Sequence, residues 1–132
     1  MKQGGTFINF VNTYSIWVAI GSFSTFLFYN ELYVLGPNYI VASGLALGMW
    51  FIYTLDHLLD GIQLKDKAIS LRHKTHFEQQ KKMKSLLLFV GIILMILALF
   101  LEKSYFTSVY LLLGLTAFHF IINYLVPKKI KK

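Results

Sequence analysis

The chain has 132 residues, no cysteine and a formal net charge of +7, and 56% of it is hydrophobic. Without cysteine there are neither disulfides nor thiolate metal sites, and the length suits a single domain. In a chain this apolar, anionic lipid headgroups are a better counter-charge for the basic residues than nucleic acid, so the composition favours an integral membrane protein and excludes nucleic acid as the partner.

Four apolar segments are long enough, or nearly so, to cross about 30 Å of hydrocarbon as helices. None alternates strictly between apolar and polar residues, which argues against barrel strands. The pattern predicts an all-α fold, an integral membrane four-helix bundle forming one domain over 1–132. We expect its helices at about 7–29, 38–60, 80–101 and 105–126.

The connections between these segments differ in charge. A basic loop at 61–85 and a basic tail at 127–132 carry most of the lysines and arginines, whereas the other two connections contain only Lys103. Because basic loops stay on the cytoplasmic side of a membrane, we expect the basic loop and both termini to be cytoplasmic. A bacterial inner membrane is the expected location.

Two carboxylates, Asp56 and Asp60, stand at the end of the second apolar segment. Residues at this spacing share one face of a helix, about 6 Å apart, and can bind one divalent cation. Mg²⁺ prefers hard oxygen ligands and keeps positions for water and phosphate. The alternative is a solvated helix end, with the acids in salt bridges to Lys65 or Lys67.

The basic loop contains a compact cluster of possible phosphate ligands, since arginine binds phosphate oxygens through two parallel hydrogen bonds. The candidate diphosphate contacts are Arg72, His73, Lys74 and His76.

Polar residues inside apolar helices are energetically expensive and indicate function. Three predicted helices place such residues at one cytoplasmic depth, which predicts a shared pocket lined by Asn12, Tyr53, His57, His119 and Asn123. The four histidines and the two aspartates leave a second interpretation open, a di-metal or haem centre.

The motif Tyr53-x-x-Asp56-x-x-x-Asp60, followed by a basic loop, resembles an aspartate-rich motif of the UbiA-type intramembrane prenyltransferases. The cluster Arg72-His73-x-x-His76 also looks like one in short members of that superfamily. The resemblance implies an all-helical protein whose two aspartates bind Mg²⁺ that bridges an isoprenoid diphosphate. It also implies that Arg72 and Lys74 contact the phosphates.

The chain departs from the family pattern in number and in detail. The family has two aspartate-rich motifs on two four-helix halves, and this chain has one; Ile52 and Tyr53 stand where the family has an Asn-Asp pair. The resemblance therefore implies a half-length protein, and a homodimer would supply the second motif. The alternative is a non-catalytic small subunit or scaffold of a larger membrane complex.

Overall fold

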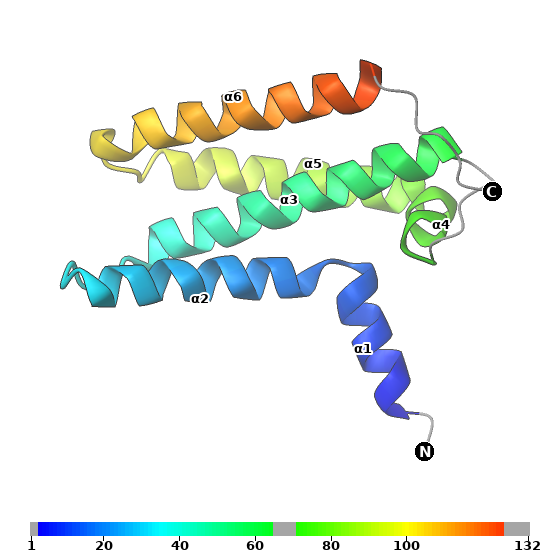
Figure 1. Cartoon of the computed structure of the whole chain (residues 1–132), viewed down its shortest axis with the longest axis horizontal. Helices are drawn as coiled ribbons and strands as arrows, with labels where there is room; N and C mark the ends of the chain where they lie inside the picture. The colour runs from blue at the N-terminus through cyan, green and yellow to red at the C-terminus, as the bar shows by residue number, and fades with distance from the viewer. Residues whose placement is uncertain (1–2, 65–70, 126–132) are drawn as a thin grey trace. The chain divides into compact units, whose positions relative to one another are not determined.

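A computed structural model describes the backbone at residues 3–64 and 71–125 and the side chains at 7–63 and 75–123. Over these ranges the chain is all-α, as the sequence predicts, and contains no strand (Figure 1). One compact unit ends at Phe100, and a second begins at Leu101. The described helices are α1 (Gln3–Thr13), α2 (Ile16–Leu32), α3 (Tyr39–Leu64), α4 (Leu71–Glu78) and α5 (Gln80–Ala98) in the first unit and α6 (Lys103–Leu125) in the second.

The predicted helix over 7–29 is divided at Tyr14 and Ser15, which corrects the expectation of one continuous helix. Ser15 has a left-handed backbone conformation (φ 56°), in which a helix of L-residues does not continue. Asn12, Thr13 and Ser15 favour this interruption, because their side chains compete for backbone hydrogen bonds. As a result, α1 departs sharply from the direction of α2 (Figure 1).

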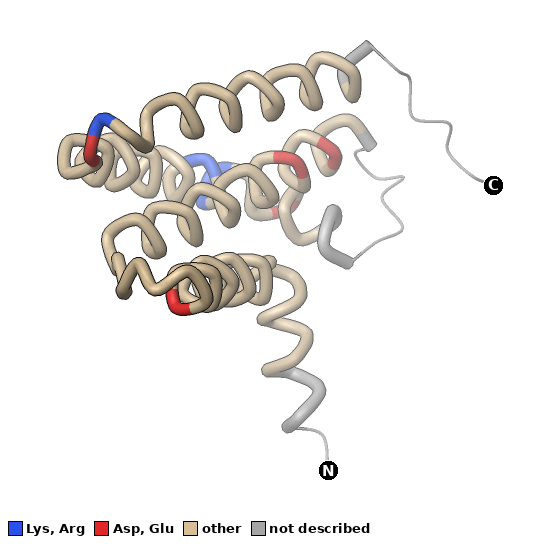
Figure 2. The backbone as a smooth tube through the Cα atoms, turned by 60° about the vertical axis from the view of Figure 1, so that its left-hand side comes forward, with Lys and Arg blue, Asp and Glu red and all other residues tan. Residues whose placement is uncertain are grey.

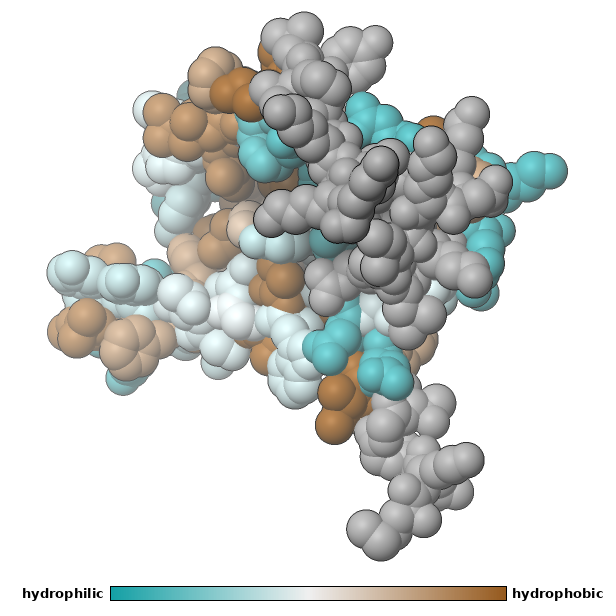
Figure 3. Space-filling model, turned by 45° about the vertical axis from the view of Figure 1, so that its right-hand side comes forward, coloured by the Kyte–Doolittle hydropathy of each residue, from teal (hydrophilic) through white to brown (hydrophobic). Residues whose placement is uncertain are grey.

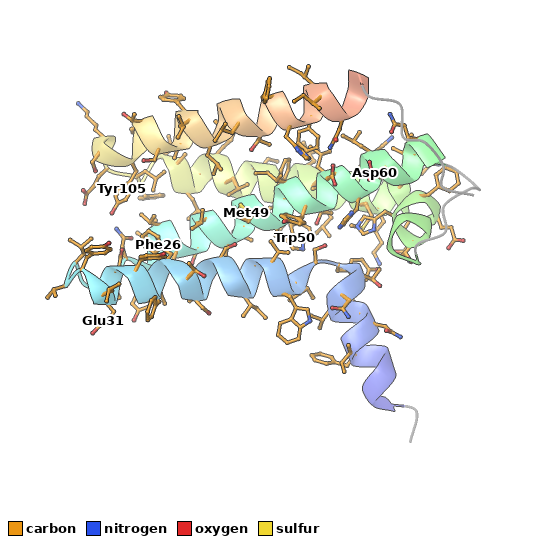
Figure 4. The ribbon with its side chains drawn as sticks, in the orientation of Figure 1. Phe26, Glu31, Met49, Trp50, Asp60 and Tyr105 are labelled. Atoms are coloured by element: carbon orange, nitrogen blue, oxygen red, sulfur yellow. The ribbon has the colours of Figure 1, made fainter. Side chains whose placement is uncertain are left out.

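The bend between α1 and α2 is fixed by a hydrogen bond from α3. In a continuous helix the carbonyl of Tyr14 would accept from the amide of Val18, but that amide donates to the carbonyl of Ser15, at 3.1 Å. The indole Nε1 of Trp50 donates to the Tyr14 carbonyl instead, at 2.7 Å. Trp50 lies on the side of α3 that faces α2 (Figure 4).

A short turn joins α2 to α3 and satisfies its own polar groups. Val34 (φ 56°) and Gly36 (φ 75°) are both left-handed, a conformation that glycine adopts without strain. The side-chain amide of buried Asn30 donates to the carbonyl of Gly36, and Oδ1 of Asn38 accepts from the amide of Val41 as an N-cap of α3. The turn brings α2 against α3, which also contacts α4 and α5.

The segment predicted as a basic loop is largely helical where the structure describes it. Helix α3 continues to Leu64, α4 covers Leu71–Glu78, and α5 begins at Gln80. The segment is rich in lysine and glutamine, which are good helix formers. Its many charged residues mask the apolar periodicity that would otherwise indicate a helix. Helix α4 contacts α1, α3 and α5.

The hydrophobic core of the first unit lies between α3 and α5. The two helices approach closely at Gly91, where an added Cβ would lie 3.6 Å from Cε2 of Phe51, an ordinary contact distance. The buried centre of this core is Leu58, Met83 and Leu87, and the partly buried side chains packed against it are Tyr14, Trp50, Phe51, Leu55 and Ile62.

Two of the described helices are long and apolar enough to cross a membrane, by length and composition alone: Tyr39–Gln63 and Lys103–Asn123. Helix α2 has 17 residues, about 25 Å at 1.5 Å each. Helix α5 has three lysines among its first five residues. Many large apolar side chains of the described helices are exposed (Figure 3). These observations favour a membrane protein, while four spans and cytoplasmic termini stay predictions.

Candidate functional site

The acidic pair lies on the C-terminal half of α3, on a face turned away from the core. Asp56 and Asp60 are one helical turn apart and partly exposed, whereas Thr54 and Leu58 are buried. A helix rotates by about 100° per residue, so Asp56 faces nearly opposite to both buried residues. Each carboxylate also has an interaction partner in the structure.

Basic residues lie at the same end of the first unit as this acidic pair. Lys81, Lys82 and Lys84 are exposed in the first turns of α5, where Met83 packs with Leu58 of α3. Figure 2 marks basic residues in blue and acidic residues in red. Helix α4 contacts α3 and includes all four predicted diphosphate contacts, three of them described by their backbone alone. The side chains of these three lie outside the described residues: Arg72, His73 and Lys74.

The fourth predicted phosphate contact, His76, is fully buried, with 0% of its surface exposed. Its ring centroid lies 5.9 Å from that of His57 on α3 and 6.2 Å from that of Tyr14 at the end of α1. The ring of Tyr53, which reaches the surface, lies 6.4 Å from that of His57. We call these four residues the aromatic cluster. His76 therefore packs inside this cluster, and its assignment to phosphate binding stays a prediction.

Tyr14 connects the aromatic cluster to the rest of the unit. Its hydroxyl donates to Oε1 of Gln79 at 3.2 Å, and its carbonyl accepts from Trp50. The hydroxyls of Ser15 and Thr54 are buried without a hydrogen-bond partner among the described residues, although buried polar groups are usually paired. Neither Tyr14 nor Gln79 is among the site residues predicted from the sequence. The polar run around Tyr14 was the signal that a backbone bend occurs there.

The structure brings together only part of the predicted pocket. Tyr53 and His57 are in contact, whereas Asn12 is exposed on α1. The remaining two residues are in the second unit, where Nδ2 of Asn123 lies 2.8 Å from Nε2 of His119 one turn earlier in α6. This contact satisfies both side chains locally, and a pocket shared with the first unit stays a prediction.

The donor set at the acidic pair suits Mg²⁺ only in part. Among the described residues there is no group of three or more histidine, aspartate or glutamate side chains that could hold a metal ion. Two carboxylates are nevertheless the number that Mg²⁺ commonly takes from protein when phosphate and water complete its shell. Asp56 and Asp60 therefore fit a site that a phosphate ligand completes.

Comparisons of this chain with protein-family models, with curated proteins and with solved structures find no match. Function is therefore argued from the chemistry of the site and its surroundings.

Proposed function

We propose that this chain is a small integral membrane protein that binds an isoprenoid or other lipid diphosphate through Mg²⁺ at Asp56 and Asp60. The observation that supports it is the contact of α4 with α3 through His57 and His76, at a ring-centroid distance of 5.9 Å. This contact places the basic α4 against the turn of α3 that carries the acidic pair. An acidic pair next to a basic helix is the combination that a metal-bound diphosphate needs.

Each part of the proposed site has a separate task. The two carboxylates would hold Mg²⁺, which when bound neutralises diphosphate charge and assists its departure as a leaving group. The side chains of Arg72 and Lys74 would hold the phosphate oxygens and stabilise the charge that develops on them. The apolar faces of α2 and α3 would leave the isoprenoid tail in lipid, so only the diphosphate needs a polar site.

The proposal includes an orientation and a partner. By the positive-inside rule, the basic residues near α4 would put the acidic pair on the cytoplasmic side, with both termini inside. A second copy of the chain would supply a second acidic pair across a two-fold axis.

The site is tested by the thermal stability of purified protein in lipid nanodiscs, with and without Mg²⁺ and a non-hydrolysable thio-diphosphate analogue of geranylgeranyl diphosphate. We expect the Tm to rise only when both Mg²⁺ and the analogue are present. Asp56→Asn and Asp60→Asn should each abolish this rise. Glu31→Gln is the matched control, because Glu31 is an exposed acid near the C-terminal end of α2, far from Asp60 (Figure 4). If the wild-type Tm does not respond to the combination, the binding proposal fails.

A second candidate function is a non-catalytic small subunit or scaffold of a larger membrane complex. In α6 none of the residues in the membrane-length segment is buried, so a long apolar helix is available to lipid or to a partner. This candidate predicts stoichiometric co-purification of other membrane proteins from native membranes. The same preparation would show no effect of Mg²⁺ and diphosphate on Tm.

A further inference from the structure

The C-terminal end of α1 is firmly attached to the first unit. Val11 and Thr13 are 3% and 9% exposed, and α1 contacts both α2 and α4. The hydrogen bond from Trp50 to the Tyr14 carbonyl and the left-handed Ser15 fix the direction in which α1 leaves. The bend is thus a built feature of the fold.

The described part of α1 before Val11 carries large apolar side chains that stay at least half exposed, although the ring of Phe10 also lies 4.8 Å from that of Tyr14, centroid to centroid. Phe7 and Phe10 are 67% and 50% exposed. Because they are three residues apart, these two rings lie on the same side of the helix. Residues two apart differ by a rotation of about 200°, so Asn9 lies nearly opposite Phe7 and Asn12 nearly opposite Phe10. Both asparagines are exposed. This stretch of α1 is therefore amphipathic although it carries no charge.

The surroundings of α1 indicate what covers its apolar side. Trp17, just after the bend, is 54% exposed, and tryptophan is enriched at membrane–water interfaces. The exposed lysines of α5, Lys81, Lys82 and Lys84, lie near α4, which α1 also contacts. Exposed lysines complement the negative surface of anionic lipids. Aromatic residues and lysines therefore meet at the end of the unit from which α1 departs.

We propose that α1 lies in the plane of the membrane interface, with Phe7 and Phe10 at the boundary between headgroups and acyl chains of an anionic leaflet. If α2 and α3 cross the bilayer, the sharp bend at Ser15 directs α1 along the surface, as in interfacial amphipathic helices. Asn9 and Asn12 then face water. The proposal depends on the membrane assignment and is independent of diphosphate binding at Asp56 and Asp60.

The absence of cysteine from the chain allows a direct test. Single cysteines replace Phe7, Asn9, Phe10 and Asn12 in turn, and a spin label on each is examined in vesicles of phosphatidylcholine and phosphatidylglycerol. Accessibility to oxygen reports lipid, and accessibility to a water-soluble nickel chelate reports water. All four positions are exposed, although Phe10 also contacts the ring of Tyr14, and elution as a single species checks that each variant folds.

We expect the oxygen-to-nickel ratio to be several-fold higher at Phe7 and Phe10 than at Asn9 and Asn12, with the two phenylalanine positions at nearly equal depth. In vesicles of phosphatidylcholine alone, the ratio at both phenylalanine positions should fall. A helix that continued along α2 would instead separate positions 7 and 10 in depth by about 4.5 Å, which would overturn the proposal. So would high nickel accessibility at all four positions, or protection of the phenylalanine positions from both reagents, which would indicate a protein partner.

Discussion

Replacing Trp50 with phenylalanine should destabilise the protein by removing one hydrogen bond. The indole Nε1 is the donor to the carbonyl of Tyr14, at 2.7 Å. The backbone amide of Val18, which would otherwise serve that carbonyl, donates to Ser15. In Trp50→Phe the carbonyl therefore loses its donor while the bend persists.

The expected magnitude follows from the burial of this carbonyl. An unsatisfied buried acceptor costs about 1–3 kcal/mol, and Tyr14 is only partly buried, so we expect about 1–2 kcal/mol. The matched control is Trp17→Phe, which deletes the same atoms from a side chain that is 54% exposed. Exposed substitutions of this kind usually change stability by less than about 0.5 kcal/mol.

The measurement is reversible unfolding in mixed micelles, with increasing mole fraction of sodium dodecyl sulfate and helix content followed by circular dichroism. Trp50→Phe should unfold at a clearly lower mole fraction than both wild type and Trp17→Phe. If the two variants unfold together, the indole hydrogen bond does not hold the bend, and the fixed direction of α1 loses its main support.

The same titration checks three further substitutions. Ser15→Gly should stabilise the protein by about 0.5–1 kcal/mol, because glycine adopts the left-handed conformation without strain. Ser15→Val should destabilise the protein by at least about 1 kcal/mol. The reverse order would contradict the left-handed backbone at this position. Thr54→Val should be neutral or stabilising by up to about 1 kcal/mol, since it removes a buried hydroxyl without a partner among the described residues, and a clear loss would reveal a partner. Gly91→Ala should change stability by less than about 1 kcal/mol, because its Cβ would meet Phe51 at an ordinary contact distance. Gly91→Leu should cost about 1–3 kcal/mol, because the larger side chain would separate α3 from α5. Equal effects of the two substitutions would show that the helices are not close there.

The sequence predicts the helical class well because apolar runs without alternation leave few other solutions. It does not reveal the bend at Ser15, because apolar residues on both sides form one run of membrane length. The signal is present in the neighbouring polar residues Asn12, Thr13 and Ser15, but Asn12 is assigned to the predicted pocket instead. Helix α4 is hidden for the opposite reason, since its charge suggests a loop although its residues favour a helix.

The candidate site divides in the same way. The acidic pair can be predicted because its spacing is local to one helix. The aromatic cluster depends on the meeting of α1, α3 and α4, so no periodicity in the sequence pairs His57 with His76 or Tyr14. The burial of His76 is likewise a tertiary result, which its place in a compact basic cluster does not indicate.

The self-sufficient turn between α2 and α3 bears on how the chain enters a bilayer during synthesis. The turn has three local hydrogen bonds, from Asn30 to Gly36, from Leu35 to Asn30 and from Val41 to Asn38. These polar groups therefore remain paired where no water is present. Glu31 is its single charged residue. If α2 and α3 both cross a bilayer, they can therefore enter it as a preassembled hairpin whose turn needs no water to satisfy these groups.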